Sequence, residues 1–351
     1  MALQEGDIIH SRYELLRLIG TGTSGSVWAA RNKLIDRDVA LKVMEPEVMS
    51  DKVLLRRFFN EAKAIGRVNH ASIVGIFDLG QAEDGSPFLV LELLDGEPLN
   101  TRIQREGAME PETLLDVSAG VAKALDLAHK QGIVHRDLKP ANIYLHRTST
   151  GGLVGKILDF GISKVVSSGT HNFSLTKTGT VVGSPAYMSP EQAAGRDDID
   201  GRADVWSLGV VLYEALTGQL PHEAPNYNAL MVRILTQDAA SIRSRMPDLH
   251  PRVVEIVDTC LQRDRDQRVN AGQLSAMLEA ATRELRAARF RRSGGRRRDD
   301  AALTGSPHDE DGGASRSAAG PTTAKVVVLA ATTLLVGCLA GLLAGYYLFQ
   351  G

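Results

Sequence analysis

This sequence of 351 residues has few cysteines, almost no net charge and no pattern typical of an N-terminal leader. Its two cysteines, Cys260 and Cys338, are too few for a disulfide framework, which favours a reducing compartment for most of the chain. The net charge of -2 argues against a protein that binds nucleic acid in a general way. The first ten residues, MALQEGDIIH, contain neither a basic stretch nor a long apolar run, so we expect no signal peptide. Internal repeats are absent too, which excludes a repeat architecture.

The composition is that of a globular chain followed by an apolar segment. Hydrophobic residues make up 43% and charged residues 23%, so most of the chain can bury a core, with room for roughly two domain-sized units. We expect a globular part over residues 13–283, a linker without regular structure over 284–324 and a transmembrane helix over 325–349. Residues 326–349 form a run of 24 without a charge, and a helix needs about 20 such residues to cross a bilayer.

The segment LLRLIGTGTSGSVWAARNK, residues 15–33, reads as a strand, a glycine-rich loop and a second strand. Its glycines at positions 20, 22 and 25, closed by Val27, let backbone N–H groups approach phosphate oxygens. A dinucleotide-binding fold would continue into a helix, and a Walker loop would end in Gly-Lys-Ser/Thr; neither follows here. From this motif alone, a glycine-rich hairpin turn is as good an interpretation as a phosphate site.

A lysine and a glutamate are predicted to face each other in the next two elements. Lys42 lies in the strand pattern DVALKVM, and Glu61 falls on the apolar face of the helical pattern that follows. That face also carries Leu54, Phe58, Ile65 and Val68. A carboxylate is costly to bury unless it is paired, so we expect Lys42 to pair with Glu61, which would hold the lysine amine where it can meet phosphate. A solvated helix edge is the alternative for Glu61.

The stretch IVHRDLKPANIYL, residues 133–145, combines an acid, a base and an amide between apolar residues. Phosphoryl transfer needs a group that receives or orients the proton of the nucleophile, and charge over the moving phosphoryl. Asp137 can take that proton, and Lys139 can lie against the γ-phosphate. Asn142 can offer an oxygen to magnesium, and Asp159 in the strand-end pattern KILDFGISK can offer a carboxylate to the same ion.

Taken together, these motifs resemble the eukaryotic-type protein kinases. Their order is the glycine loop, V-A-x-K, the helix glutamate, H-R-D-L-K-P-x-N from His135 to Asn142, D-F-G from Asp159, S-P-E from Ser189, D-V-W-S-L-G from Asp204 and, late in the domain, Arg268. The resemblance covers about 270 of the 351 residues, and so many motifs in one order are specific. The composition also looks like that of bacterial serine/threonine kinases that end in a membrane anchor.

The resemblance implies an α+β fold with two lobes, a small β-rich N-lobe over residues 13–94 and a larger helical C-lobe over 95–283. ATP would bind between the lobes, beneath the glycine loop. The loop residues expected around the nucleotide are Gly20, Thr21, Gly22, Thr23, Ser24, Gly25, Ser26 and Val27.

Adenine contacts follow from the same resemblance. The residues expected above the ring are Ile19, Val27 and Ala40. The backbone of Glu92 and Leu94 would read the edge of the ring. Tyr144 would form the floor, a position where Leu or Met is more usual.

The resemblance also assigns the catalytic roles. Lys42 would hold the α- and β-phosphates, and Asp137 would be the catalytic base. Lys139 lies in an H-R-D-L-K sequence, which resembles that of kinases specific for serine and threonine rather than tyrosine. Asn142 and Asp159 would bind Mg²⁺, with Mn²⁺ as an alternative.

Three further residues match structural positions of the family. Glu191 and Arg268 match an ion pair, and Asp204 matches a residue that braces the catalytic loop. Two positions depart from the family pattern: Ser189 stands where alanine is usual, and Ser184 where threonine is usual. Neither departure removes a charge or a metal ligand, so we expect activity to survive both.

Regulation is expected in the hydroxyl-rich segment between Asp159 and Glu191. Arg136 lies next to the predicted base and could pair with a phosphate, which would order the segment. The sequence SLTKTGTVVGS resembles the activation loops of bacterial kinases that phosphorylate themselves at two threonines, which here match Thr176 and Thr178. The alternative, compatible with the first, is a mobile polar loop.

The tail has eight arginines within residues 283–298, and this stretch could extend the last helix and then unravel. Its arginines suit anionic lipid head groups, a solvated charge run or, least well, nucleic acid. Positive charge before the predicted span implies a single-pass protein of the cell (inner) membrane with a cytoplasmic kinase domain. Gly337, Gly341 and Gly345 share one face of the span, which permits a homodimer, although glycine is common in membrane helices anyway.

Three functions are compatible with these motifs. The first is an ATP-dependent kinase of protein substrates. A pseudokinase scaffold would commonly lack Lys42, Asp137 or Asp159, and all three are present. A small-molecule phosphotransferase would usually lack the S-P-E segment and the long hydroxyl-rich segment before it.

Overall fold

The computed structural model describes residues 3–22, 25–44, 52–160 and 184–302. By its contacts the chain divides into two units, residues 1–297 and 298–351. All the elements below lie in the first unit apart from the end of the last helix.

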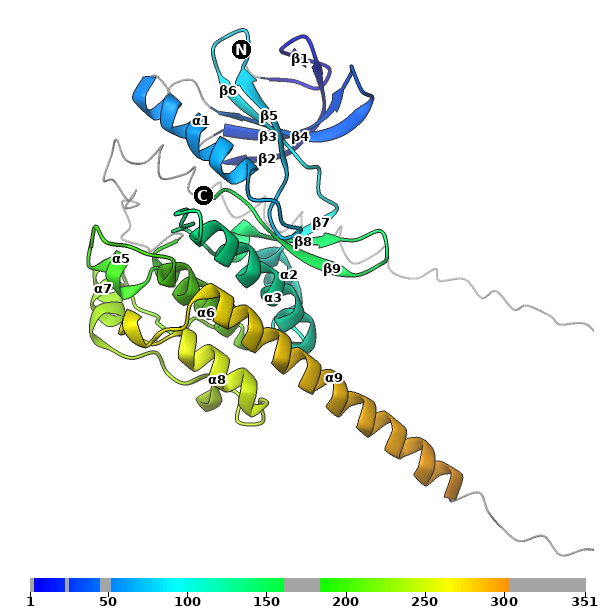
Figure 1. Cartoon of the computed structure of the whole chain (residues 1–351), viewed down its shortest axis with the longest axis vertical. Coiled ribbons are helices and arrows are strands. Elements are labelled where there is room, and N and C mark those ends of the chain that lie inside the picture. The colour runs from blue at the N-terminus through cyan, green and yellow to red at the C-terminus, as the bar shows by residue number, and fades with distance from the viewer. Residues whose placement is uncertain (1–2, 23–24, 45–51, 161–183, 303–351) are drawn as a thin grey trace, which may run out of the picture. The chain divides into compact units, whose positions relative to one another are not determined.

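Six antiparallel strands and one helix form the N-terminal lobe, with the strands in the order β1-β2-β3-β4-β6-β5 (Figure 1). The bounds are β1 Ile8–Ile9, β2 Tyr13–Gly22, β3 Gly25–Asn32, β4 Arg37–Met44, α1 Lys52–Gly66, β5 Ile76–Gln81 and β6 Pro87–Leu91. Leu41 of β4 packs on Trp28 in one apolar cluster, and Met44 packs on Phe58 of α1 in another. Because side chains alternate along a strand, Lys42 shares the face of Met44, which is the face that α1 covers.

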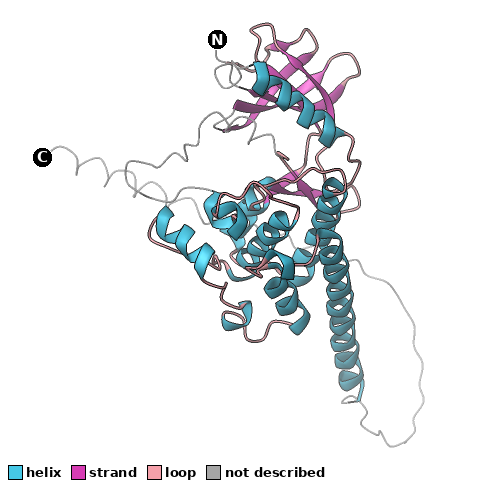
Figure 2. Cartoon of the chain, turned by 60° about the vertical axis from the view of Figure 1, so that its left-hand side comes forward, coloured by secondary structure: helices cyan, strands magenta, loops and turns pink. Residues whose placement is uncertain are grey.

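The C-terminal lobe is mainly helical, and Figure 2 shows its helices apart from the N-terminal sheet. The longer helices are α2 Leu99–Glu106, α3 Pro111–His129, α6 Arg202–Thr217, α7 Tyr227–Thr236, α8 Pro251–Cys260 and α9 Ala271–Ala302. The shorter helical turns are η2 Pro140–Asn142, η3 Ser184–Tyr187, α5 Pro190–Ala193, η4 Ile242–Ser244 and η5 Arg265–Gln267. Helix α6 is buried on nearly all sides, as expected of a helix that is apolar all round. The predicted two-lobed α+β fold is confirmed.

A small sheet of β7 Gly96–Pro98, β8 Ile143–Arg147 and β9 Leu153–Ile157 aligns the two segments that carry the predicted metal ligands. Ile143 pairs with Ile157 at the end of the β8–β9 ladder. Asn142 directly precedes β8, and Asp159 follows β9 by two residues. The Leu158 N–H donates to the Asn142 carbonyl at 2.8 Å, so the ladder places these two segments side by side.

Helix α9 extends beyond the boundary predicted for the globular part. The sequence predicts a linker from residue 284 whose first part could extend the last helix, and in the structure the helix continues to Ala302. Arg286 lies 3.1 Å from Glu112 and 3.0 Å from Asp116, both on α3, and Arg289 lies 3.6 Å from Glu112. These long-range ion pairs hold the first part of the arginine-rich stretch against the C-terminal lobe.

Among the residues that the structure describes, no helix is both long and apolar enough to cross a membrane. The predicted span over residues 325–349 lies outside the described residues. So do its three glycines, Gly337, Gly341 and Gly345.

Candidate active site

The glycine loop joins β2 to β3 as a hairpin in which Gly22 pairs with Gly25. Gly25 has φ +141°, and a Cβ there would lie 2.0 Å from the Val43 carbonyl oxygen of β4. A side chain is therefore excluded at Gly25 both by its backbone conformation and by its neighbour. Ile19, Thr21 and Ser26 lie on the two strands of the hairpin, whereas Thr23 and Ser24 lie outside the described residues.

Lys42 is paired with Asp159 rather than with Glu61. The amine of Lys42 is nearly buried, and its Nζ lies 2.5 Å from Asp159 Oδ1. Glu61 lies on α1, half-buried, in the lining of a cavity that also includes Arg136 and Phe160. The predicted pair of Lys42 with Glu61 is therefore wrong, because the carboxylate that contacts the lysine belongs to Asp159, 117 residues further along the chain.

Among the predicted catalytic-loop residues, Lys139 and Asn142 both contact the carboxylate of Asp137. Lys139 Nζ donates to Asp137 Oδ2 at 2.9 Å, and Asn142 Nδ2 donates to the same oxygen at 3.3 Å. Asn142 Nδ2 also donates to the Asp137 carbonyl at 2.8 Å, which closes the loop on itself. The acid of this site is thus held in one orientation by an ammonium and an amide, as their offsets in the sequence suggested.

Asp204, at the start of α6, holds the backbone of this loop from below. Its Oδ1 accepts from the Arg136 N–H at 2.7 Å, and its Oδ2 accepts from the His135 N–H at 2.8 Å. His129 Nε2, at the end of α3, lies 2.7 Å from the same Oδ2. Burial raises the pKa of the Asp204 carboxyl, but the hydrogen bonds and the nearby histidines outweigh it and bring the pKa below its usual range.

Two residues of the site have left-handed backbones that are uncommon outside glycine. Arg136 has φ +63° and Asp159 has φ +51°. The fully buried His135 lies between them: its ring packs edge-on against Phe160 with 4.9 Å between centroids, and its Nε2 lies 2.9 Å from the Leu158 carbonyl oxygen. Such strained residues persist where their surroundings over-determine them, and they concentrate at functional sites.

The predicted adenine wall lies where the two lobes join. The Glu92 N–H donates to the Gly75 carbonyl at 2.8 Å, and Glu92 Oε2 accepts from Lys156 Nζ at 2.7 Å. The Tyr144 hydroxyl donates to the Gly96 carbonyl at 2.9 Å, which fixes the unusual aromatic at this position. Burial raises the pKa of that phenol, with Asp95 adding to the effect.

Glu191 and Arg268 form a buried, two-pronged ion pair with N–O distances of 2.7 and 2.6 Å. The Arg268 side chain is fully buried, and that of Glu191 is 4% exposed. Burial raises the pKa of Glu191, but the Arg268 guanidinium outweighs it and holds the pKa below its usual range. This pair connects the segment that carries Glu191 to the turn after α8.

Residues 13–278 match the model of the protein kinase domain family. The chain belongs to the protein kinase family. Its site therefore has the expected parts of a kinase: a glycine loop, a strand lysine, a catalytic loop and a D-F-G aspartate, all within the matched range.

Curated protein kinases that resemble the chain include serine/threonine-protein kinase pkn3 of Myxococcus xanthus, 36% identical over 284 residues, which cover 80% of this chain and 52% of pkn3. Serine/threonine-protein kinase PknA of Mycobacterium tuberculosis (strain ATCC 25618 / H37Rv) is 37% identical over 287 residues, which cover 81% of this chain and 64% of PknA. The chain spans between half and two thirds of the length of these relatives. The solved kinase domain of M. tuberculosis PknI shares the fold, with a TM-score of 0.61 and 24% identity over 80% of this chain and 99% of that one.

Two contacts of the kinase site involve residues that the motifs did not single out. His129 contacts Asp204, and Gln192 Nε2 donates to the Arg136 carbonyl at 2.8 Å. Neither residue type signals a role by itself, although both flank a recognised motif. Thr176 and Thr178, the predicted phosphorylation sites, lie outside the described residues.

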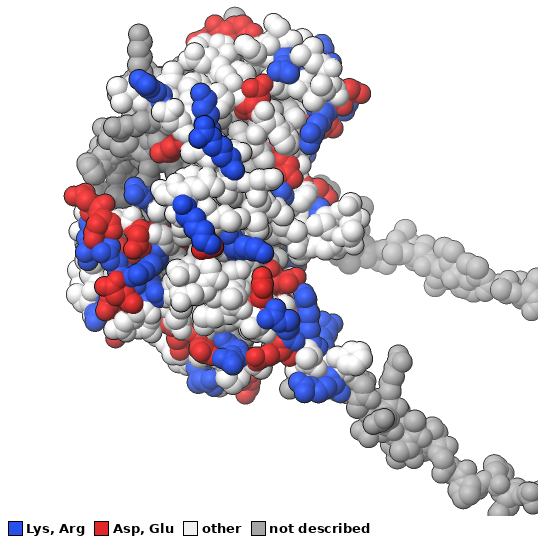
Figure 3. Space-filling view, viewed as in Figure 1, with Lys and Arg blue, Asp and Glu red and all other residues white. Residues whose placement is uncertain are grey.

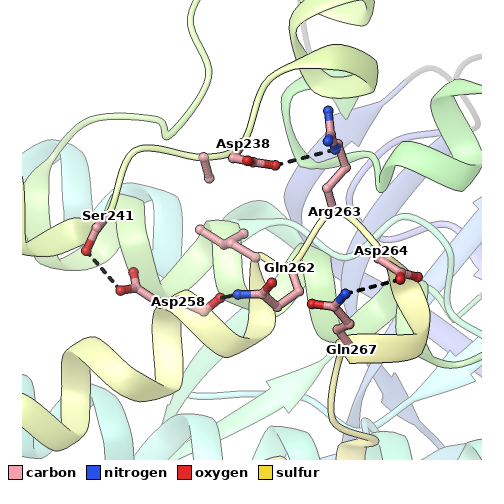
Figure 4. Close-up of a pocket in the computed structure, with 9 residues that line it drawn as sticks. Asp238, Ser241, Asp258, Gln262, Arg263, Asp264 and Gln267 are labelled. Carbon is pink, nitrogen blue, oxygen red and sulfur yellow. Dashed lines mark hydrogen bonds and ion pairs between the residues drawn. The ribbon is translucent and has the colours of Figure 1, made fainter.

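A larger cavity of about 440 Å³ lies elsewhere on the kinase domain, between the end of α7 and the turn after α8 (Figure 4). Its polar side chains are engaged with one another: Ser241 donates to Asp258 at 2.9 Å, and Arg263 lies 3.4 Å from Asp238. No predicted catalytic residue lines it.

Around the helical lobe, basic and acidic side chains are interspersed on the face that Figure 3 shows.

Proposed function

We propose that this protein kinase transfers phosphate from ATP to serine and threonine side chains of proteins. The observation that carries the proposal is the convergence of residues from three separate stretches of the chain, at position 42, positions 137–142 and position 159. Lys42 reaches Asp159 at 2.5 Å, the segments of Asp159 and Asn142 are joined at 2.8 Å, and Asn142 reaches Asp137 at 3.3 Å. The Lys42–Asp159 pair and the Asn142–Asp137 pair are thus linked through the backbone hydrogen bond between Leu158 and Asn142.

These residues fit a nucleotide with a divalent metal ion. Asn142 and Asp159 would hold Mg²⁺ through the hard oxygens that it prefers, and Lys42 would meet the α- and β-phosphates. In the glycine loop, Gly25 packs so closely on the Val43 carbonyl of β4 that only glycine fits there. When bound, the metal would supply positive charge to the phosphate oxygens.

Asp137 would accept the proton of the attacking hydroxyl. Its side chain is 21% exposed, so a substrate can reach it, and Lys139 and Asn142 hold it in one orientation. Lys139 would also lie against the transferred phosphoryl and spread its charge. Kinase activity of this kind is in accord with the names of the curated relatives, which are serine/threonine-protein kinases.

Activation would follow autophosphorylation at Thr176 and Thr178. Arg136 is exposed beside Asp137, and a phosphothreonine carries about -1.5 to -2 charges at neutral pH, which Arg136 would pair with. The pairing would couple the phosphorylated segment to the loop that holds the catalytic acid.

One assay tests both the transfer and its self-directed form. With labelled ATP and Mg²⁺, the purified chain should label a generic protein substrate and itself, and peptide mapping should locate its own label at Thr176 and Thr178. Chelation of the metal should abolish both signals, because the phosphates then lose the charge that the metal supplies. Labelling of small metabolites but not of protein would favour a small-molecule phosphotransferase, and no labelling at all would favour a pseudokinase. An active wild type without label at either threonine would contradict the activation step.

We also propose that the chain is anchored in the cell membrane by residues 325–349, with the kinase domain in the cytoplasm and dimers formed through Gly341. The support is the uncharged run of 24 residues and the arginines before it. After cell fractionation and high-salt washing, wild type and Gly341→Ile should remain with membranes. Replacing Leu334 and Leu342 by lysine should release the chain, because charge at the centre of a span opposes insertion.

Cross-linking in membranes tests the dimer separately. Gly341→Ile should reduce the dimer yield because isoleucine prevents close helix packing. An equal yield would remove the dimer proposal, and retention of the double-lysine variant in washed membranes would contradict the span.

A further inference from the structure

Ser189, where the family usually has alanine, begins a hydrogen-bonded unit with Gln192. The Ser189 side chain is fully buried and caps α5, with its Oγ 3.3 Å from the Gln192 backbone nitrogen. In return, Gln192 Oε1 accepts from the Ser189 N–H at 3.1 Å and from its hydroxyl at 3.2 Å. This reciprocal pattern is a capping box.

The capping box fixes which way the Gln192 amide points. Its oxygen is engaged by the two Ser189 donors, so its NH₂ group faces away from α5. There Nε2 donates to the Arg136 carbonyl oxygen at 2.8 Å. Both partners support this assignment of the oxygen and nitrogen atoms of the Gln192 amide. The Ser189 N–H needs an acceptor, which is the amide oxygen, and the Arg136 carbonyl needs a donor, which is the amide nitrogen.

Arg136 is consequently held on both of its peptide groups. Its N–H donates to Asp204 at 2.7 Å, and its carbonyl accepts from Gln192 at 2.8 Å. Its φ of +63° is a conformation that arginine seldom adopts. The Arg136 carbonyl belongs to the peptide bond that precedes Asp137, the proposed catalytic base. The hydrogen bond from Gln192 therefore helps to fix the orientation of this peptide and, with it, the direction of the Asp137 side chain.

We propose that Gln192, oriented by Ser189, is a positioning residue for the catalytic loop. Its hydrogen bond fixes the Arg136–Asp137 peptide. The position of the S-P-E segment thereby influences the orientation of Asp137. The inference rests on the proposed kinase function, because its effect is on the transfer step. Asp204 holds one side of the strained residue and Gln192 the other.

The variant Gln192→Glu separates positioning from folding. Glutamate retains the capping box with Ser189, since Ser-x-x-Glu is a preferred form, but it cannot donate to the Arg136 carbonyl. We expect kcat for a protein substrate to fall about 5- to 10-fold, the effect of one lost hydrogen bond and the repulsion that replaces it. The KM for ATP and the melting temperature should stay near those of the wild type.

The chain offers a matched control in a second capping box at the start of α9. There the Asn270 N–H donates to Gln273 Oε1 and the Gln273 N–H donates to Asn270 Oδ1, each at 2.9 Å. Gln273→Glu makes the same chemical change away from the catalytic loop and should leave kcat unchanged. Ser189→Ala should lower kcat only about 2-fold, because the Ser189 N–H still holds the amide oxygen.

All variants are compared as full-length chains, with steady-state rates divided by the folded fraction from thermal unfolding. A kcat for Gln192→Glu equal to that of the wild type would overturn the inference. So would a loss that vanishes after this correction, which would give Gln192 a structural role only. An inactive wild type would instead refute the proposed kinase function, so the two failures are distinguishable.

Discussion

Asp137→Asn is expected to lower kcat for protein phosphorylation about 10²- to 10⁴-fold, the usual contribution of a positioned acid or base. Asparagine has nearly the same shape and can still accept from Lys139 and Asn142, whose donors lie 2.9 and 3.3 Å from Asp137 Oδ2. What it lacks is the negative charge that receives the proton of the substrate hydroxyl. Steady-state rates with saturating ATP, Mg²⁺ and a protein substrate measure the loss.

Two comparisons make this result specific. The KM for ATP should be nearly unchanged, since Asp137 is proposed to act on the hydroxyl rather than on the nucleotide. Asp248→Asn, the same change at an exposed aspartate in the connection between η4 and α8, should retain wild-type rates. If Asp137→Asn kept a tenth or more of the wild-type kcat, Asp137 would not be the proton acceptor.

The residues of the site that could be read from the sequence are those whose chemistry is local. Asp137, Lys139 and Asn142 lie within six positions, and their contacts with one another follow directly from that spacing and the turn at Pro140. The predicted apolar face of the α1 segment is likewise buried at Phe58 and Ile65. Local spacing therefore predicted the contacts of the catalytic loop, whereas the two lobes were expected from the resemblance to the protein kinases.

The parts that the sequence left open depend on contacts between distant segments. The sequence predicts Glu61 as the partner of Lys42, but in the structure the Lys42 amine lies 2.5 Å from Asp159, which comes 117 positions later in the chain. Gln192 reaches Arg136 over 56 positions, and no pattern within α5 indicates that. The composition of residues 284–302 resembles a linker, yet Arg286 finds Glu112 on α3, 174 positions earlier. Composition does not reveal such partners.

The contacts around Arg136 form a continuous series of hydrogen bonds. His129 contacts Asp204, Asp204 holds the Arg136 N–H, and Gln192 holds the Arg136 carbonyl. Just before Gln192 in sequence, Glu191 points the other way and is held by Arg268. The short helix α5 therefore connects the catalytic loop on one side with the interior of the C-terminal lobe on the other.

Arg268→Met is accordingly expected to destabilise the protein by about 3–5 kcal/mol, the usual cost of removing one partner from a buried ion pair. The guanidinium of Arg268 makes two bonds to Glu191 and donates to the carbonyls of Arg202, Gln262 and Arg263 at 3.0, 2.7 and 3.1 Å. Methionine fills much of the same space but leaves the Glu191 carboxylate without a cation. Urea unfolding of the full-length chain at pH 7 measures the difference.

The surface offers a control for the loss of an arginine as such. Arg252 pairs with Glu255 at 3.0 Å, but its side chain is 57% exposed. Arg252→Met should change the free energy of unfolding by less than about 1 kcal/mol, as is usual for exposed pairs. The double variant with Glu191→Gln should recover part of the loss caused by Arg268→Met, because the amide carries no charge to bury.

The pH dependence of the loss tests its electrostatic origin. In the wild type the pKa of Glu191 is below its usual range, so its ionised form stabilises the fold at neutral pH, and this stabilisation is lost as the pH falls through that lowered pKa. In Arg268→Met the guanidinium no longer lowers the pKa of the Glu191 carboxyl, and burial raises it against only the hydrogen bonds from the backbone and Ser189, so the pKa is higher than in the wild type. The carboxyl therefore protonates at a higher pH than in the wild type, and its burial penalty disappears as it does so. The difference in unfolding free energy between wild type and variant should therefore narrow from pH 7 toward pH 5. A difference that stays constant over this range would show that Arg268 contributes by packing and backbone contacts rather than by its charge.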